Sequence, residues 1–323
     1  MEPGARSLSV RPVASRPRAI VTGGAGFIGS HLVDRLLSEG WAVLVIDDLS
    51  TGNAKNLAET ARLEVLDIAG EGLDRIFSDW RPRVVYHLAA QASVPGSVRA
   101  PLRDLAVNVI GTHRVLAAST HCRAERLVFV SSGGAVYGET RRPATERTLP
   151  APTSYYGVHK LAAEGHVIVS GLSYAIARPS NVYGPRQAGG LEGAVVAAFL
   201  EQAAGNARLE VHGDGSQTRD FVHVRDMVDA LLLLGLEEDA VGIWNVASGR
   251  RIRIVDVADI VEHCLGYRLT RTWSARRTGD VTHSAISAAR LRALGWRPSI
   301  RLYTGIDELV GLTIRTRPGA PFA

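Results

Sequence analysis

The sequence is poor in cysteine and has no long hydrophobic run. Its 323 residues include two cysteines, Cys122 and Cys264, whose spacing matches neither a metal site nor a redox motif. This argues against a disulfide-stapled scaffold, and we expect both thiols to be buried in a reducing compartment. No apolar stretch reaches the length of a membrane span, so we expect no membrane association.

We also expect no signal peptide. Residues 1–17 contain Arg6, Arg11, Arg16 and three prolines but no apolar core, so we predict a flexible tail on a cytoplasmic protein. Aromatic residues make up 6% of the chain, and no stripe of basic and aromatic residues suits a nucleic acid. The formal net charge of +5 therefore favours anionic small-molecule ligands over nucleic acid.

What the sequence does contain is a strand, a glycine turn and a helix start within residues 19–32. Gly23 suits the tight turn, Gly26 lets backbone N–H groups approach a pyrophosphate, and Gly29 allows close packing of helix on strand. Asp47 ends the next apolar run, near the roughly 20-residue offset of a carboxylate that binds an adenosine ribose. An ordinary strand–helix turn is the alternative, but the combined pattern predicts a dinucleotide site.

The first half of the chain alternates apolar strands with helices, which predicts an α/β fold. We expect a Rossmann-type doubly wound parallel sheet, covered on both faces, with a smaller mixed α/β lobe at its C-terminal side. The predicted strands are residues 19–22, 42–46, 63–66, 84–88, 127–130 and 174–177. The predicted organisation is a tail at 1–17, a dinucleotide-binding domain at 18–180 to which 222–246 returns, and a substrate lobe at 181–221 and 247–323.

Tyr156 and Lys160 form a second candidate constellation. They lie four residues apart and share one face of a predicted helix, whereas Tyr155 faces elsewhere. A free tyrosine has a pKa of about 10, and a neighbouring ammonium favours its phenolate, which can then accept a proton from a substrate hydroxyl. Surface neighbours with this spacing are common, so the placement after a dinucleotide fold is what favours a catalytic pair.

Several further motifs extend this pattern over residues 18–300. They are Thr22–Gly29, Asp47–Gly52, Asp67-Ile68, His87–Ser93, Asn108–Thr112, Ser131–Gly138, Tyr156 with Lys160, Arg178–Pro185, Gln217–Val224 and Arg277–Asp280. With them the sequence resembles the extended short-chain dehydrogenase/reductase family, and most closely its UDP-glucose 4-epimerase-like group of nucleotide-sugar enzymes. The resemblance implies NAD as the cofactor, a UDP-sugar as the substrate and no metal.

The resemblance also implies roles for individual residues. Cofactor binding is expected at Gly23, Gly26, Phe27, Ile28, Gly29, Asp47, Asn53, Asp67, Ile68, Leu88, Ala89, Ala90, Gln91, Asn108, Tyr156 and Lys160. Substrate binding is expected at Ser132, Tyr156, Asn181, Arg219 and Arg277, with Asp220 and Asp280 orienting the arginines. The expected catalytic residues are Tyr156, Lys160 and Ser132, which replaces a hydroxyl that many relatives carry at the position of Gly133.

The implied reaction is inversion at C4 of the sugar through a 4-keto intermediate, with hydride lent to NAD and returned. Asp47 favours NAD over NADP, because a carboxylate repels a 2′-phosphate. A dehydratase or decarboxylase of the same family is an alternative, although Gly134 and Ala135 stand where those relatives carry an acid. A non-catalytic NAD-sensing protein is an alternative of another class.

The resemblance further bears on substrate range and assembly. Ser284 is small at a position that gates the C2 substituent, which implies tolerance of UDP-N-acetylhexosamines, and Arg186 or Arg276 could bind the carboxylate of a UDP-glucuronate. A homodimer is expected through the predicted helices at 102–119 and 156–170. The apolar stripe of Leu105, Val109 and Leu116 suits that interface, but it suits the protein core equally well.

Overall fold

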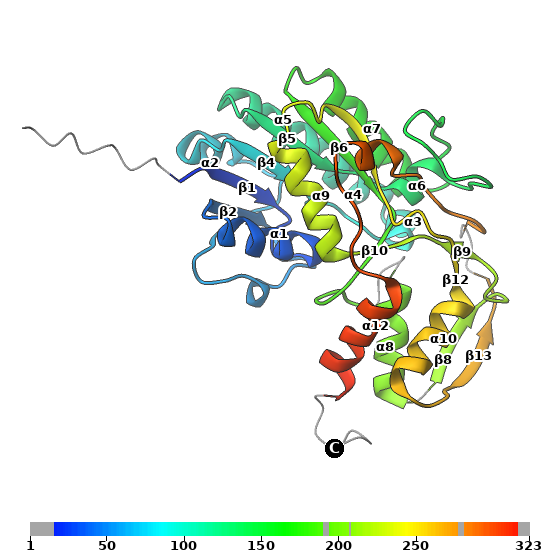
Figure 1. Cartoon of the computed structure of the whole chain (residues 1–323). Coiled ribbons are helices and arrows are strands. Elements are labelled where there is room, and N and C mark those ends of the chain that lie inside the picture. Colours follow the sequence, from blue (N-terminus) through cyan, green and yellow to red (C-terminus); the bar gives the residue numbers. More distant parts are fainter. Residues whose placement is uncertain (1–15, 190–193, 207, 277–280, 316–323) are drawn as a thin grey trace, which may run out of the picture.

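A computed structural model describes residues 16–189, 194–206, 208–276 and 281–315 of the chain (Figure 1). Within these residues, a parallel sheet of seven strands forms the larger part of the molecule. In spatial order its strands are β11 (Gly242–Val246), β6 (Tyr174–Pro179), β5 (Arg126–Val130), β4 (Val84–His87), β1 (Arg18–Thr22), β2 (Ala42–Asp47) and β3 (Arg62–Val65). The doubly wound fold predicted from the sequence is confirmed.

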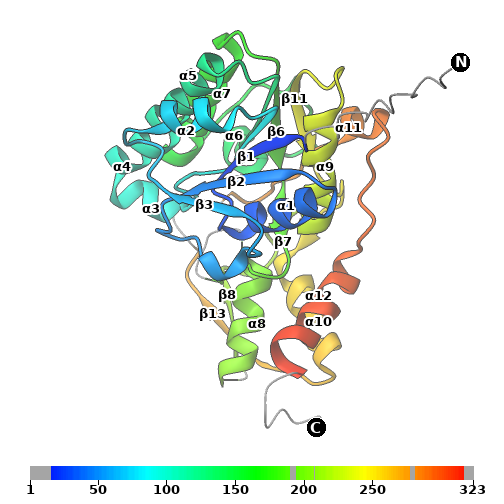
Figure 2. The ribbon, with the colours of Figure 1, turned by 90° about the vertical axis from the view of Figure 1, so that its left-hand side faces the viewer.

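Two rows of helices cover the sheet because its central strands are apolar on both faces. The bounds of the helices are α1 (Phe27–Ser38), α2 (Leu73–Trp80), α3 (Val94–Arg99), α4 (Pro101–Leu105), α5 (Thr112–His121), α6 (Gly133–Tyr137), α7 (Tyr155–Val169), α9 (Val224–Leu236) and α11 (Ala289–Ala293). Helices α1 and α9 pack together on one face, and α2, α5 and α7 pack on the other (Figure 2). Each row encloses its own apolar core, with Leu36 and Met227 in one and Phe77 and Val167 in the other.

The remaining elements form a smaller lobe below the sheet (Figure 1). They are β7 (Asn181–Tyr183), α8 (Val195–Asn206), β8 (Arg208–His212), β9 (Thr218–Arg219), β10 (Phe221–His223), β12 (Ile252–Arg253), α10 (Ile254–Leu265), β13 (Thr270–Ser274) and α12 (Leu302–Val310). This lobe has a separate apolar core that includes Phe199, Leu209 and Val261. The domain boundaries stay a prediction. Strand β11, which lies in the segment 222–246 that was expected to return to the first domain, pairs with β6 in the large sheet.

The structure also differs from the sequence prediction at several points outside the sheet. The helix predicted at 102–119 is divided into α4, a π-helical segment η2 (Ala106–Gly111) and α5. A short helix, α6, follows β5 where no helix was predicted, and Ser132 caps its N-terminus. Cys264 is buried as expected, whereas Cys122 is only partly buried.

Two short helical segments complete the chain. They are η1 (Ala54–Asn56) and the C-terminal η3 (Gly311–Arg315). No helix in the described ranges combines the length and the apolar character needed to cross a membrane.

Candidate active site

A cavity of about 860 Å³ runs along the carboxyl ends of the strands and continues into the smaller lobe. This is where parallel α/β sheets bind ligands. The predicted cofactor residues that line it are Gly23, Gly26, Phe27, Ile28, Gly29, Asp47, Asp67, Ile68, Leu88, Ala89, Ala90, Gln91, Tyr156 and Lys160. The predicted substrate residues that line it are Ser132, Tyr156, Asn181 and Arg219, while Arg277 lies outside the described residues.

The glycine turn has no room for side chains. Gly23 has φ +70°, and a Cβ atom there would lie 2.6 Å from the backbone nitrogen of Ala89. A Cβ on Gly29 would lie 2.1 Å from the carbonyl oxygen of Gly23. No side chain caps the N-terminus of α1, whose first turn lines the cavity. The turn is thus a cradle of the shape and polarity that a pyrophosphate requires.

Asp47 ends β2 beside this cradle. Its Oδ2 accepts a hydrogen bond from the backbone N–H of Ala25 and its Oδ1 accepts one from that of Leu49, both at 2.9 Å. Burial raises the pKa of Asp47 above its ordinary value, while these two hydrogen bonds oppose the rise. The backbone therefore holds the carboxylate in place at the edge of the cavity, where an adenosine ribose would need an acceptor.

Two predicted cofactor residues do not reach the cavity. Asn53 is exposed and caps η1, with its Oδ1 accepting a hydrogen bond from the backbone N–H of Lys55 at 3.0 Å. Asn108 is buried in η2, where its Nδ2 donates to the carbonyl oxygen of Gln91 at 3.0 Å. Asn108 therefore acts on the cavity through Gln91, because Gln91 lines it.

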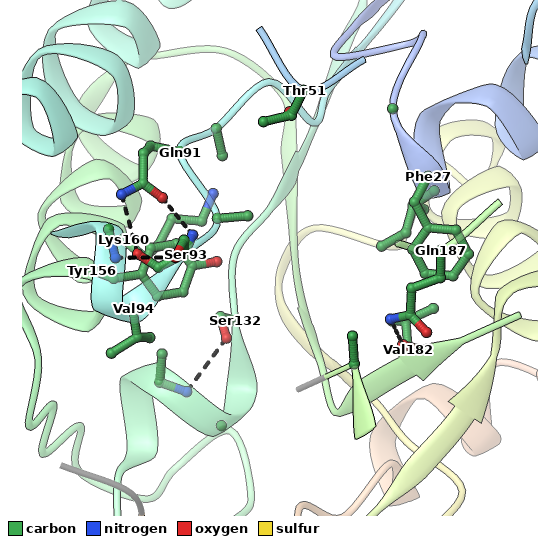
Figure 3. Close-up of a pocket in the computed structure, with 18 of the residues that line it drawn as sticks. Phe27, Thr51, Gln91, Ser93, Val94, Ser132, Tyr156, Lys160, Val182 and Gln187 are labelled. Atoms are coloured by element: carbon green, nitrogen blue, oxygen red, sulfur yellow. Dashed lines mark hydrogen bonds between the residues drawn. The ribbon is translucent and has the colours of Figure 1, made fainter. Parts of the chain in front are cut away.

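The side chains of Tyr156, Lys160 and Ser132 lie on one wall of the cavity, opposite Phe27 and Gln187 (Figure 3). Helix α7 starts beside the cavity because Ser154 caps it, accepting a hydrogen bond from the N–H of Gly157 at 3.2 Å. Nζ of Lys160 donates to the carbonyl oxygen of Val130 at 2.7 Å.

Burial governs the charge state of Lys160. Its ammonium lies 4.5 Å from the centre of the Phe129 ring, and the residue is 2% exposed. This desolvation lowers the pKa of Lys160 to about 8, against the opposing effect of Glu164 and Asp104. The ammonium is therefore the main form at neutral pH, as required to favour the Tyr156 phenolate.

Two histidines near the centre have structural partners. His87 is fully buried between the hydroxyls of Thr22 and Thr112, and burial lowers its pKa to about 3. His159 bonds to Asp104 at 2.5 Å and faces α4. Both placements agree with the expectation that neither histidine is an acid–base catalyst.

Arg219 lines the smaller-lobe end of the cavity, but Asp220 does not orient it. The Asp220 carboxylate instead accepts hydrogen bonds from Ser180, from both donors of Ser248 and from the N–H of Gly249. The prediction for Asp220 is therefore wrong, because its carboxylate is buried and its hydrogen-bonding capacity is used by Ser180 and by the loop around Ser248. Asp280 lies outside the described residues.

The sequence analysis missed several polar residues of the cavity. They are Ser93, Gln187, Gln202, Glu210, His212 and Gln217. Gln217 begins the Gln217–Val224 motif from which Arg219 was predicted. Its place in that motif was the one sequence feature that could have pointed to a missed residue of the smaller lobe. Neither Arg186, which pairs with Asp34 at 2.8 Å, nor Arg276, which donates to Thr282 at 2.6 Å, lines the cavity.

Comparison with known proteins identifies the family. The model of the NAD dependent epimerase/dehydratase family matches residues 19–247. The UDP-glucose 4-epimerase of Mycolicibacterium smegmatis is 38% identical over 304 residues, which cover 91% of this chain and 97% of that protein.

Solved structures agree with this match. The UDP-glucose 4-epimerase of Thermotoga maritima, solved with UDP-glucose, superposes with a TM-score of 0.88 at 38% identity, covering 93% of this chain and 99% of that one. The UDP-glucose 4-epimerase of Thermus thermophilus, solved with NAD, has a TM-score of 0.88 at 37% identity, covering 93% and 100%. The chain therefore belongs to the NAD-dependent epimerase/dehydratase family.

Proposed function

We propose that the protein is an NAD-dependent nucleotide-sugar 4-epimerase of the UDP-glucose type. The observation that carries the proposal is the placement of Tyr156, Lys160 and Ser132 on one wall of a cavity that also contains the glycine cradle. Relatives and structural neighbours that cover nearly the whole chain are UDP-glucose 4-epimerases. The reaction is inversion of the C4 hydroxyl by oxidation to a 4-keto sugar and reduction from the other face.

The residues present fit NAD. The first turn of α1 and the glycine cradle would hold the pyrophosphate, and Asp47 would accept hydrogen bonds from the adenosine ribose. When bound, NAD supplies the reversible hydride acceptor that the reaction needs. The Asp47 carboxylate disfavours NADP, because it would repel a 2′-phosphate by on the order of 4 kcal/mol per unit charge at 4 Å.

Tyr156 serves as the base and acid of the reaction. Its phenolate accepts the proton of the C4 hydroxyl as the carbon is oxidised, and its phenol returns that proton when the carbon is reduced. The buried Lys160 ammonium stabilises the phenolate. Ser132 donates a hydrogen bond to the same sugar oxygen, from a position fixed by its cap on α6.

The nucleotide diphosphate is assigned to the smaller lobe. Arg219 and Asn181 line that end of the cavity, and a guanidinium can donate two hydrogen bonds to a phosphate. Arg277 would complete the set. Holding the diphosphate while the sugar is free to turn explains how both faces of C4 can be presented to one base.

The cavity favours epimerisation over elimination or decarboxylation. Those reactions need a second acid near the sugar, yet Gly134 and Ala135 occupy that part of the wall. Among the described residues that line the cavity, the acids are Asp47, Asp48, Asp67 and Glu210. Asp47 and Glu210 lie on β2 and β8, and Asp48 and Asp67 follow β2 and β3. None of these elements carries Ser132 or Tyr156.

We also propose that the sugar pocket accepts an N-acetyl group at C2. Ser284 lines the cavity, and its Oγ lies 3.4 Å from where a Cβ on Gly134 would be. Both residues are small, so the wall they form leaves room for a substituent. For a UDP-glucuronate, Arg186 and Arg276 offer no partner within the cavity.

We propose a homodimer through α4, η2 and α7. Leu102, Ile110, Val158 and Val169 on these elements are 79%, 46%, 47% and 80% exposed. Apolar side chains gathered on one helical face are typical of an interface. Of the stripe predicted from the sequence, Leu116 is buried in the core instead.

The free thiols of Cys122 and Cys264 support a cytoplasmic protein.

The test is to incubate the protein with UDP-glucose, UDP-galactose, their N-acetyl forms and UDP-glucuronate, and to resolve the products. We expect interconversion of the first two and of the N-acetyl pair. Tyr156→Phe should lower kcat by about 10²–10⁴-fold, the usual contribution of a positioned acid–base group, with little change in KM. Full turnover by Tyr156→Phe would refute the mechanism, and an NAD-loaded wild-type protein without any epimerase activity would favour the NAD-sensing alternative.

A further inference from the structure

A buried polar network lies behind the reaction centre. Nε of Arg178 donates to Oε1 of Glu164 at 2.9 Å, and Nη2 of Arg178 donates to Oε2 at 2.5 Å. Oγ of Ser131 donates to Oε1 of the same carboxylate at 2.5 Å. Glu164, Arg178 and Ser131 are 1%, 2% and 3% exposed. One carboxylate thus connects α7, β6 and the end of β5.

This network supports both halves of the reaction centre. Glu164 lies on α7 one turn after Lys160 and two turns after Tyr156, so the three residues share a helix face. Ser131 lies between Val130, whose carbonyl accepts the Lys160 hydrogen bond, and Ser132. A substitution of Glu164 is therefore expected to affect the Lys160 ammonium through α7 and the Ser132 hydroxyl through the end of β5.

Charges on the surrounding elements determine whether Lys160 stays protonated. Helix α7 contributes Glu164 and Tyr156, and α4 contributes Asp104, whose carboxylate bonds to His159. Strand β6 contributes Arg178 on the far side of Glu164, where the guanidinium lies over the Tyr137 ring at 4.8 Å. The groups on β4 and β5 are the neutral His87, the Phe129 ring and the Val130 carbonyl.

We propose that Glu164 is a positioning residue of the reaction: its buried carboxylate keeps Lys160 as an ammonium and fixes the Ser131–Ser132 segment. The inference rests on the proposed function, in which Lys160 and Ser132 act on the reacting hydroxyl. Glu164 does not line the cavity, so it works through these neighbours and does not touch substrate. A desolvated cation loses protonation readily once its counter-charge is removed.

The sequence offers a direct measurement of this effect. The chain contains two lysines, Lys55 and Lys160, so lysine labelled with ¹⁵N at Nζ gives two resonances, which Lys55→Arg assigns. In the NAD-loaded protein, Glu164→Gln should move the titration midpoint of Lys160 down by about one pH unit, a tenfold change in proton affinity. Glu164→Asp keeps the charge and should leave the midpoint near that of the wild type. Lys55 serves as the internal control.

Kinetics provide the second readout. At pH 8, Glu164→Gln should lower kcat about fivefold with KM little changed, because fewer molecules carry the ammonium. Ser131→Ala removes one hydrogen bond and no charge, so it should lower kcat without moving the Lys160 midpoint. A purely structural role predicts no difference between the two substitutions, so the Lys160 midpoint would be the same in Glu164→Asp as in Glu164→Gln.

The outcomes separate this proposal from the proposed function. An unshifted Lys160 midpoint in folded Glu164→Gln overturns the proposal, as does an equal shift in Glu164→Asp. If Glu164→Gln fails to fold because Arg178 is left unpaired, the double variant Glu164→Gln, Arg178→Met is compared with the single variant Arg178→Met, so that the two proteins differ only at Glu164. An equal Lys160 midpoint in these two proteins overturns the proposal. Full turnover by Tyr156→Phe would instead refute the proposed function, whatever the lysine titration shows.

Discussion

Replacing Gly29 by alanine puts a methyl group where the structure has no space. The new Cβ would lie 2.1 Å from the carbonyl oxygen of Gly23, and within 2.9 Å of two further backbone atoms of the turn. These are backbone atoms, so no side chain can rotate away, and α1 must move by about 1 Å from the cradle. Overpacking of this kind costs typically about 1–3 kcal/mol, and the rigid neighbours favour the upper end.

This cost falls mainly on NAD binding, because the same backbone forms the pyrophosphate cradle. A loss of about 3 kcal/mol raises the Kd for NAD by about 150-fold. Calorimetric titration of the NAD-free protein measures this directly. Gly205→Ala is the matched control, since Gly205 is also helical but has nothing within 4 Å of its added Cβ. An affinity in Gly29→Ala within threefold of the wild type would refute the assignment of the cradle.

Other residues give sharper tests of single roles. His87→Gln removes a histidine whose folded pKa of about 3 is below its ordinary 6.5, so the stability it confers is complete above pH 6.5 and is lost as pH falls toward 3. In urea titrations, the free energy of unfolding of the wild type should therefore fall relative to that of His87→Gln by about 1.5–2 kcal/mol between pH 6.5 and pH 5. A difference that stays constant over this range would contradict the neutral state of His87. Asp47→Asn should raise the affinity for NADP relative to NAD at least about tenfold in competition binding, because it removes the repelling charge; an unchanged ratio would count against the ribose assignment. Ser284→Tyr should lower kcat/KM for UDP-N-acetylglucosamine far more than for UDP-glucose, and equal losses would place the C2 group elsewhere. Arg219→Met should raise KM for UDP-glucose at least about tenfold with a smaller effect on kcat, and Arg225→Met, at an exposed ion pair, is its control.

The parallel sheet could be predicted because its determinants are local. β1, β2, β4, β5 and β6 are short, mostly apolar runs, and each of the turns after β1 and β2 contains glycine or aspartate. Tyr156 and Lys160 could be paired for the same reason, since residues four apart on a helix always share a face. The cradle at Gly23 and Gly29 could be predicted because the spacing of its glycines depends on a single local turn of the backbone.

Interactions between distant segments could not be predicted. Asp220 was expected to orient Arg219, yet its donors come from Ser180 and from the loop at Ser248, which only the folded chain brings together. The division of the helix predicted at 102–119 involves the packing of η2 against a distant segment. Gly111 at the end of η2 lies so close to Ile68 that an added Cβ would be 2.8 Å from the Ile68 side chain. The Glu164–Arg178 pair likewise joins two elements by a tertiary contact that no spacing rule describes.

The position of β11 at the edge of the large sheet affects how the chain folds during synthesis. Residues 242–246 pair with β6, although the chain makes β7, α8, β8, β9, β10 and α9 between these two strands. Until the ribosome has released residue 246, β6 is an open edge with unpaired N–H and C=O groups, a surface that recruits other strands. Fragments that end between β10 and β11 should therefore aggregate, and molecules stalled there during translation should depend on chaperones more than those released in full.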